Sequence, residues 1–211
     1  MDNELIIYLD INEFDDKTGA DVISFVYNPA TKITWNKFNE AKKHSFSKDE
    51  VKRVITGPVM LADTPIRRYS DVIGDYFVKF SKESIFKMVK KYFKENKIHN
   101  TNEEHNKKTM RVGDGIYMIE SFIVGDRVTS ELYPELPEGT WVASFFIEDE
   151  NYWNNIIMGD EFKGFSLEGK FIEYYEDEVI EQVYSEVENI LNSNLSDDEK
   201  EIKIKSVLNI K

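Results

Sequence analysis

Short runs of β-branched and aromatic residues, separated by turn-forming residues, recur along this chain and limit what it can fold into. These runs lie at residues 4–10, 21–27, 116–124, 140–148 and 164–175. Each has the length and composition of a strand, whereas a helix needs about ten or more residues with apolar side chains at helical spacing. Because helix-like segments are inserted at only a few places, the pattern predicts an α+β domain that is barrel-like or sandwich-like, not a parallel α/β sheet.

Three other segments have helical features. Residues 81–96 carry one apolar stripe at helical spacing, which predicts a helix lying on a sheet. Residues 149–159 fit a short helix with Asp149 as its N-cap. The Ser-Lys-Asp-Glu run at residues 47–50 has capping-box spacing and predicts the start of a further short helix.

The C-terminal stretch differs from the rest of the chain in charge. From Glu173 to the end there are 11 acidic residues and 4 lysines. An apolar stripe at helical spacing, followed by a second capping box at residues 196–199, predicts a helical hairpin here. We therefore divide the chain into a domain, residues 1–175, and an acidic helical tail, residues 176–211. Packing against the domain and packing against another protein explain the stripe of the tail equally well.

Composition narrows the classes of function. Hydrophobic residues make up 41% of the chain and aromatic residues 13%, as in a folded globular protein and unlike a disordered one. The formal charge of -13, from 27 basic and 40 acidic residues, opposes binding to a phosphate backbone. We therefore expect no nucleic-acid partner.

The sequence also predicts that the chain is neither a membrane protein nor a secreted one. No apolar run approaches the roughly 18 to 20 residues of a membrane span, and the acidic start lacks the basic flank of a signal peptide. The chain has no cysteine, which excludes a disulfide framework, a cysteine nucleophile and a thiolate metal site. We expect a soluble, cytosolic protein with no membrane partner.

The three histidines, His44, His99 and His105, do not have the spacing of metal ligands. No two of them stand at H-x-x-x-H or H-x-H spacing, so we expect neither a metal nor another cofactor. Each is by default a solvated surface histidine. His105, in the polar run NEEHNKKT at residues 102–109, has a second interpretation, as half of a catalytic pair whose other half lies further along the chain.

Ser166 is held between two glycines, Gly164 and Gly169, in the run KGFSLEG. Glycines allow a sharp turn and a close backbone approach, which can expose a serine hydroxyl and free backbone N–H groups to stabilise an oxyanion. The spacing is not the G-x-S-x-G of the α/β-hydrolase elbow. A plain strand between two bends explains the run equally well.

Glu120 is unusual because of its position in the strand-like run 116–124. In a strand it shares a face with Met118 and Phe122, where an unpaired carboxylate would be costly to bury. Either that face is exposed or the carboxylate has a partner, for which an imidazolium would be suitable. Ser166, His105 and an acid such as Glu120 or Asp126 could therefore form a triad, but only through the fold.

Six phrases of this chain resemble, in the same order, the XkdF-like prohead protease family of tailed phages and prophages. They are GPVMLADTPIRR, DYFVKFSKESI, TNEEH, IESFIV, GTWVASFFIEDENYW and GDEFKGFSLEGKF. The preceding run SFVYNPATKITWNKF fits the segment in which such proteins tend to have an S-x-V-x-x-P-A phrase. The resemblance covers residues 20–172, so that the acidic tail lies outside it.

The resemblance implies a capsid-maturation serine endopeptidase with an assemblin-like fold, a small β-barrel surrounded by helices. Such enzymes act in the host cytoplasm inside the phage procapsid, where they digest the scaffold, trim the capsid protein and often cleave themselves. The partners are then the scaffold and major capsid proteins, and the assemblin analogy implies a homo-oligomer. The histidine of the family falls on His105 and its serine on Ser166. The resemblance does not assign the third member, for which Glu120 remains the choice, with Asp126 as the alternative.

Two other functions are compatible with the same residues. One is a catalytically inactive structural head protein that keeps the protease fold. The other is a scaffold-associated component in which the domain is a binding module and the tail directs assembly. The acidic charge and the helical tail do not distinguish among the three.

Overall fold

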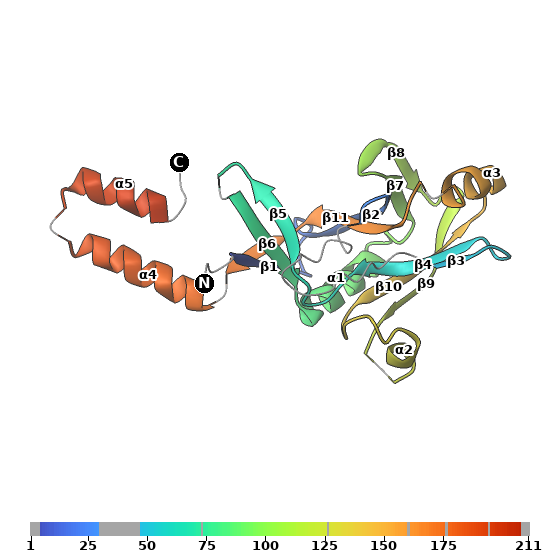
Figure 1. Ribbon diagram of the computed structural model, residues 1–211, viewed down its shortest axis with the longest axis horizontal. Helices are drawn as coiled ribbons and strands as arrows, with labels where there is room; N and C mark the ends of the chain where they lie inside the picture. Colours follow the sequence, from blue (N-terminus) through green and yellow to red (C-terminus); the bar gives the residue numbers. More distant parts are fainter. Residues whose placement is uncertain are drawn as a thin grey trace.

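The computed structural model describes the following residues, with the backbone alone for 177–183: 5–29, 47–72, 74–125, 127–159, 161–175, 177–193 and 195–207. In these ranges the strands form three four-stranded sheets, with helices around them and a helical hairpin at one end (Figure 1). The mixed α+β class that the sequence predicts is confirmed.

The three sheets differ in strand order. The first comprises, in order, β12 (Ile172–Tyr175), β1 (Ile6–Asp10), β6 (Gly74–Phe80) and β5 (Ile66–Ser70). The second comprises β3 (Ser47–Asp49), β4 (Val54–Met60), β10 (Trp141–Ile147) and β9 (Ile116–Ile123). The third comprises β11 (Gly164–Lys170), β2 (Gly19–Val26), β7 (Asn100–Glu103) and β8 (Asn106–Val112). β1 pairs with β6 and β2 with β7 in parallel, and the other pairs are antiparallel.

The expectation of a barrel is wrong for the part of the chain that the structure describes. Each sheet there ends in edge strands, and the hydrogen-bonded ladders do not continue from one sheet into the next. A closed barrel requires a continuous ladder with matched strand tilt and stagger. The residue pattern identifies strands, but it does not fix which strands pair, so it could not distinguish open sheets from a closed one.

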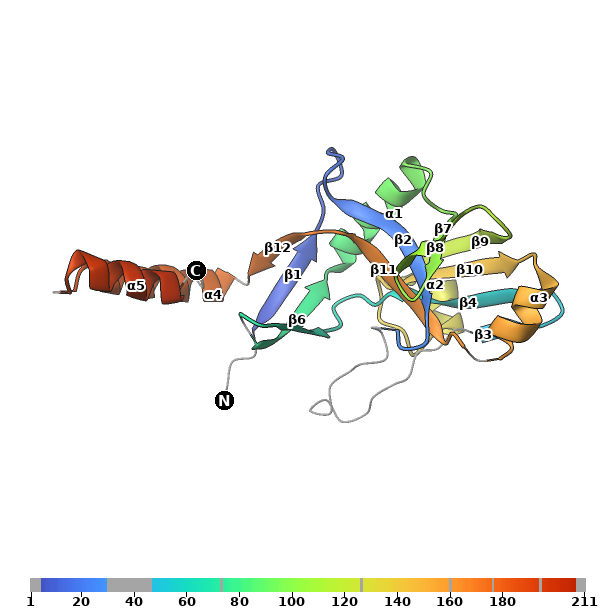
Figure 2. The same cartoon turned by 90° about the horizontal axis from the view of Figure 1, so that it is seen from above.

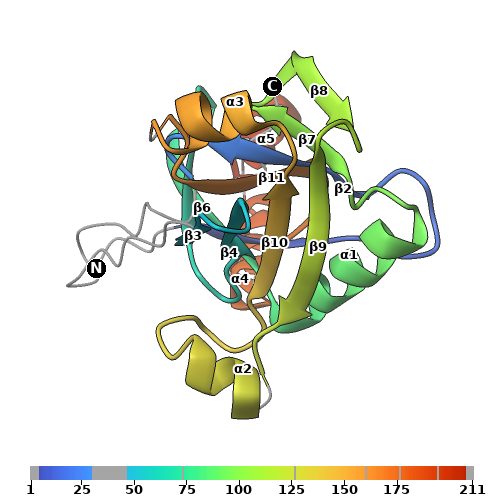
Figure 3. The same ribbon diagram turned by 90° about the vertical axis from the view of Figure 1, so that its right-hand side faces the viewer.

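Helix α1 (Lys82–Lys94) is the helix expected over residues 81–96, and it packs against β2 and β1. Its N-cap, Ser81, accepts a hydrogen bond from the Ser84 backbone N–H, and Ile85, Met88 and Tyr92 of its apolar stripe are buried. Helix α3 (Glu150–Tyr152) begins at the expected N-cap Asp149 and continues as a π-helical turn. Helix α2 (Arg127–Leu132) and α3 lie at opposite ends of the β9–β10 pair (Figure 3).

The short helix expected at residues 47–50 is absent, and this prediction is wrong. The structure has strand β3 at these residues, paired with β4. The Asp49 carboxylate accepts the Lys52 backbone N–H at 3.0 Å, so it stabilises a turn between the two strands. A capping-box spacing satisfies backbone donors in a turn as well as in a helix, and the strand-forming residues of β4 decide between them.

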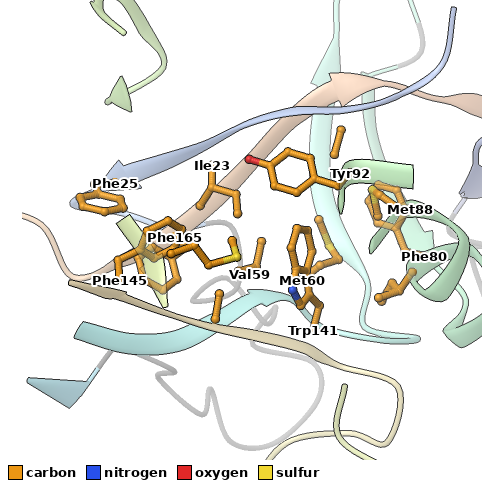
Figure 4. Close-up of a cluster of buried hydrophobic side chains, with 14 of the residues drawn as sticks. Ile23, Phe25, Val59, Met60, Phe80, Met88, Tyr92, Trp141, Phe145 and Phe165 are labelled. Atoms are coloured by element: carbon orange, nitrogen blue, oxygen red, sulfur yellow. The ribbon is translucent and has the colours of Figure 1, made fainter. Parts of the chain in front are cut away.

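The core is built from large aromatic side chains contributed by all three sheets and α1 (Figure 4). The rings of Phe25, Phe145 and Phe165 form a triangle with centroid separations of 5.2 to 5.4 Å. The Tyr92 ring of α1 packs edge-on against Trp141 at 5.5 Å. Truncating one such buried ring to alanine typically costs about 3 to 5 kcal/mol, so this cluster fixes β11 firmly against β2.

Strand alternation places polar side chains of β2 and β11 on the face opposite the core. Phe25 and Phe165 point into the aromatic cluster, and their neighbours Ser24 and Ser166 therefore point the other way. Ser24 and Ser166 are directly opposite each other in the β2–β11 register. Packing of the core thus determines where both hydroxyls lie.

The C-terminal residues form two antiparallel helices, α4 (Asp177–Leu191) and α5 (Asp197–Val207), that contact each other. They extend away from the three sheets beyond β12 (Figure 2). Ser196 and Glu199 make the reciprocal contacts of a capping box at the start of α5: the Ser196 backbone N–H donates to the Glu199 carboxylate at 3.0 Å, and the Glu199 backbone N–H donates to the Ser196 hydroxyl at 3.4 Å.

Candidate functional site

His105 lies in a tight turn that joins β7 to β8. Glu103 pairs with Asn106 across the hairpin, and the two residues between them, Glu104 and His105, have φ values of 48° and 57°. Positive φ at both central residues is the signature of a type I′ hairpin turn, and it is uncommon for residues other than glycine. The Glu104 backbone N–H donates to the Phe25 carbonyl at 3.0 Å, which holds the turn beside β2.

The turn brings the His105 ring to a buried polar cluster on β2, β7 and β11. Its Nδ1 atom lies 3.1 Å from the Ser24 hydroxyl and 3.3 Å from Glu168 Oε1. The same Glu168 oxygen accepts hydrogen bonds from the Ser24 hydroxyl and from the Asn102 side-chain amide, each at 2.6 Å. Ser24 and Asn102 are almost completely buried, whereas 46% of the His105 side chain is exposed.

These contacts determine which nitrogen of His105 carries the proton in the neutral ring. The Ser24 hydroxyl has a single hydrogen, which it donates to the Glu168 carboxylate, so its oxygen can only accept from Nδ1. Both atoms near Nδ1 are therefore acceptors, and we assign the proton to Nδ1. Nε2 has no hydrogen-bond partner in the described part of the chain, which leaves its lone pair free to act as a base.

Ser166 and His105 line the same cavity, which has a volume of about 660 Å³. Glu168 also lines it, because it lies two residues after Ser166 on β11 and so on the same face of the strand. Within the described residues the Ser166 hydroxyl has no hydrogen-bond partner, and it is not bonded to His105. The structure thus places the serine and the histidine proposed from the sequence on one cavity, without a hydrogen bond between them.

Two opposing effects act on the carboxyl of Glu168. Burial raises its pKa, but the hydrogen bonds from Ser24, Asn102 and His105 outweigh burial, and the pKa lies below its ordinary value. Glu168 is therefore ionised at neutral pH. A carboxylate in this position orients the imidazole and stabilises the imidazolium that forms when Nε2 takes up a proton.

This lowered pKa predicts a pH-dependent contribution of Glu168 to stability. The contribution is fully present above the pKa of the unfolded chain, near 4.5, and is lost as the pH falls through the lower folded value. We expect the midpoint of urea unfolding of wild type to fall below pH 4.5, and that of Glu168→Gln to fall less over the same pH range. Equal pH slopes for the two proteins over that window would contradict the prediction.

The two glycines that flank Ser166 have close structural neighbours. A side chain at Gly164 would meet Pro29 at 2.6 Å, and one at Gly169 would meet the Gly19 carbonyl oxygen at 2.2 Å. The β2–β11 register shifts between Glu168 and Gly169. Irregularities of this kind interrupt the ladder and are frequent beside active sites. The oxyanion role of backbone N–H groups near Gly164 to Gly169 stays a prediction.

The structure does not bring Glu120 to His105. The Glu120 carboxylate lies on β9 and accepts a hydrogen bond from the Ser144 hydroxyl of β10 at 2.6 Å. Ser144 is in turn 2.8 Å from the Thr56 hydroxyl of β4. The Glu120 side chain is exposed, so the first of the two alternatives holds and the carboxylate needs no charged partner. The acid beside His105 is Glu168.

The other nominated side chains lie elsewhere or outside the described residues. Asp126 and His44 fall on positions that the structure does not describe. His99 is half-buried instead of solvated: its Nδ1 accepts the Met118 backbone N–H at 3.3 Å, and its ring packs edge-on against Tyr117.

Among the residues with described positions, no three His, Cys, Asp or Glu side chains are grouped as metal ligands. None of the helices described is long and apolar enough to cross a membrane.

Sequence reasoning missed Ser24, Asn102 and Glu168. Alternation along the strand that carries Ser166 would have placed Glu168 on the same face, two positions later. Nothing in the sequence marks Ser24, which is 144 residues away from Glu168.

Comparison of the chain with known protein families, curated proteins and solved structures found no match.

Proposed function

We propose that this chain is a serine endopeptidase in which Ser166 is the nucleophile, His105 the general base and Glu168 the acid that orients His105. The observation that carries the proposal is the arrangement around the imidazole. Nδ1 contacts Glu168 and Ser24, Nε2 has no hydrogen-bond partner among the described residues, and His105 and Ser166 line one cavity. This is the division of roles that a serine, histidine and acid triad requires.

The chemistry follows the usual two steps of acyl transfer. Ser166 Oγ bonds to the peptide carbonyl carbon as its proton passes to Nε2 of His105, and the imidazolium then gives that proton to the leaving amine as the C–N bond breaks. Water attacks the resulting ester, its proton passes through Nε2 to Ser166 Oγ, and the acid product leaves. Glu168 stays ionised and stabilises the imidazolium in both steps.

Within this proposal the biological role is capsid maturation in a phage. It rests on the six phrases that resemble the XkdF-like prohead proteases in the same order along residues 20–172. The substrates are then the scaffold and major capsid proteins, met inside the procapsid in the host cytoplasm. An assemblin-like arrangement of the strands, in open sheets instead of a closed barrel, belongs to the same proposal.

A second candidate function is a structural or scaffold-associated head protein without activity. The observation in its favour is the missing hydrogen bond between Ser166 and His105. Catalytic hydrogen bonds often form only when substrate is bound, so a missing hydrogen bond in the substrate-free chain is also compatible with catalysis.

Labelling with a fluorophosphonate distinguishes the two functions. Such a probe reacts with a serine only when a base and an oxyanion site activate it. We expect mass spectrometry of the labelled protein to find one adduct, on Ser166. A chain that stays unlabelled at neutral pH, or that is labelled on another serine, would contradict the proposal.

For the tail we predict a role in docking or targeting to scaffold or capsid protein, with removal by self-cleavage. Helices α4 and α5 extend away from the sheets that hold the site. Deleting residues 176–211 should therefore reduce the amount of protein packaged into proheads much more than the rate of peptide hydrolysis. Packaging is measured on purified proheads and hydrolysis on the free protein. Equal loss of both would count against the prediction.

A further inference from the structure

The cavity that holds Ser166 and His105 contains one arginine, Arg68, which comes from a different sheet. Arg68 lies on β5, opposite Tyr76 of β6. Its neighbour Arg67 points to the other side of the strand and forms an ion pair with Asp75 at 2.6 Å. Two adjacent arginines thus have different surroundings, and only Arg68 belongs to the cavity lining.

The Arg68 guanidinium has no acidic partner among the described residues. Its Nη1 donates to the Arg67 carbonyl oxygen at 3.2 Å, and no carboxylate of the described chain lies within ion-pair distance. The carboxylate that shares the cavity, Glu168, is already bonded to Ser24, Asn102 and His105. The Arg68 side chain is exposed, yet partial desolvation of its guanidinium lowers the pKa of Arg68, and the group nevertheless stays charged.

Most of the remaining cavity wall is apolar. Leu9, Met60 and Phe80 are buried, and Leu167 and Phe171 are half-buried. The Phe80 and Phe171 rings pack edge-on at 5.0 Å. A ligand group that suits these surroundings has an aliphatic stem and a carboxylate end, because a guanidinium without a counter-ion binds carboxylates with two parallel hydrogen bonds.

We infer that Arg68 is a specificity residue that selects peptides with an acidic side chain beside the bond to be cleaved. The inference rests on the proposed endopeptidase function and names its substrate class. A substrate aspartate or glutamate would supply the carboxylate that Arg68 lacks, while its aliphatic carbons contact the apolar wall. Arg68 acts on the side chain of the substrate and not on the reacting carbonyl.

The test begins with a library of peptides whose cleavage sites are identified by mass spectrometry. We expect aspartate or glutamate to be enriched at one position beside the cleaved bond. For a peptide pair that differs only by glutamate or glutamine at that position, the glutamate peptide should have a kcat/KM about 10- to 100-fold higher, the range that a charged hydrogen-bonded pair supplies.

Arg68→Gln should remove most of this preference by lowering kcat/KM for the glutamate peptide far more than for the glutamine peptide. Arg68→Glu should favour lysine in place of glutamate. The matched control is Arg67→Gln, which removes an arginine one residue away and outside the cavity, and which should keep the preference of wild type.

Three results would overturn the inference. Cleavage without enrichment of acidic residues, or a preference that survives Arg68→Gln, would show that Arg68 does not select the substrate. Equal losses on both peptides would assign Arg68 to the reacting carbonyl instead. Labelling of Ser166 by fluorophosphonate separates these results from failure of the proposed function, because labelling does not depend on a substrate side chain. If the chain is neither labelled nor cleaves peptides, the proposed function and this inference fail together.

Discussion

Ser166→Ala should abolish cleavage of scaffold and capsid proteins when it is co-expressed with them, whereas the wild-type chain should produce discrete fragments. Removing the nucleophile of a serine peptidase lowers kcat by about 10⁴-fold or more, which leaves no fragments detectable by mass spectrometry. The fold should be unaffected. Ser166 is half-buried and its hydroxyl makes no hydrogen bond within the described residues, so removing the hydroxyl leaves no buried group without a partner.

The matched control is Ser24→Ala, because Ser24 lies directly opposite Ser166 in the β2–β11 register. Unlike Ser166, it lies within hydrogen-bonding distance of His105, at Nδ1, and it is completely buried. This variant should keep detectable cleavage and labelling, with a loss of about tenfold from one hydrogen bond to Glu168. If Ser24→Ala abolishes labelling and Ser166→Ala does not, Ser24 is the nucleophile. If both variants process the partners like wild type, the activity belongs to another protein.

The sequence nominates Ser166 and His105 from their local settings, and the structure places them on one cavity although 61 positions separate them in the chain. Such nomination is feasible because flanking glycines and a polar turn are local features. The acid is not a local feature. Glu168 reaches His105 only because β11 and β7 both pair with β2, and these pairings join segments that are far apart in sequence.

The same limit explains the errors in the fold. The strand positions follow from composition, but the closure of sheets depends on which strands become edges, and the residue pattern carries little information about that. Glu120 shows the same limit. The β9–β10 register shifts between Met118 and Glu120, which breaks the alternation assumed for this strand, so that Met118 is buried while Glu120 is exposed and accepts a hydrogen bond from Ser144. No feature of the isolated run 116–124 indicates this irregularity.

Glu168→Gln should lower kcat/KM by about 10³- to 10⁴-fold with little change in KM, the loss typical of a triad whose acid becomes an amide. Glutamine keeps the size of the side chain, but its NH₂ group can take the position of Oε1, the one oxygen that faces Ser24, Asn102 and Nδ1 of His105. From there it donates to Nδ1, which favours the tautomer with the proton on Nε2. That tautomer cannot take the proton of Ser166. The ¹⁵N resonances of His105 should therefore change from a protonated Nδ1 in wild type to a protonated Nε2 in the variant.

Glu120→Gln is the matched control for this prediction, since it makes the same chemical change at the acid that the sequence favours. Glu120 accepts a hydrogen bond from Ser144, which a glutamine oxygen can also accept, so activity and the His105 resonances should stay close to those of wild type. A large loss in Glu120→Gln with normal activity in Glu168→Gln would identify Glu120 as the third member of the triad. A loss of activity in Glu168→Gln without a change of tautomer would mean that Glu168 supports the structure of the turn and does not orient the base. Because the change of tautomer is a direct consequence of the hydrogen bond between Glu168 and Nδ1, it tests the assigned role more strictly than the rate does.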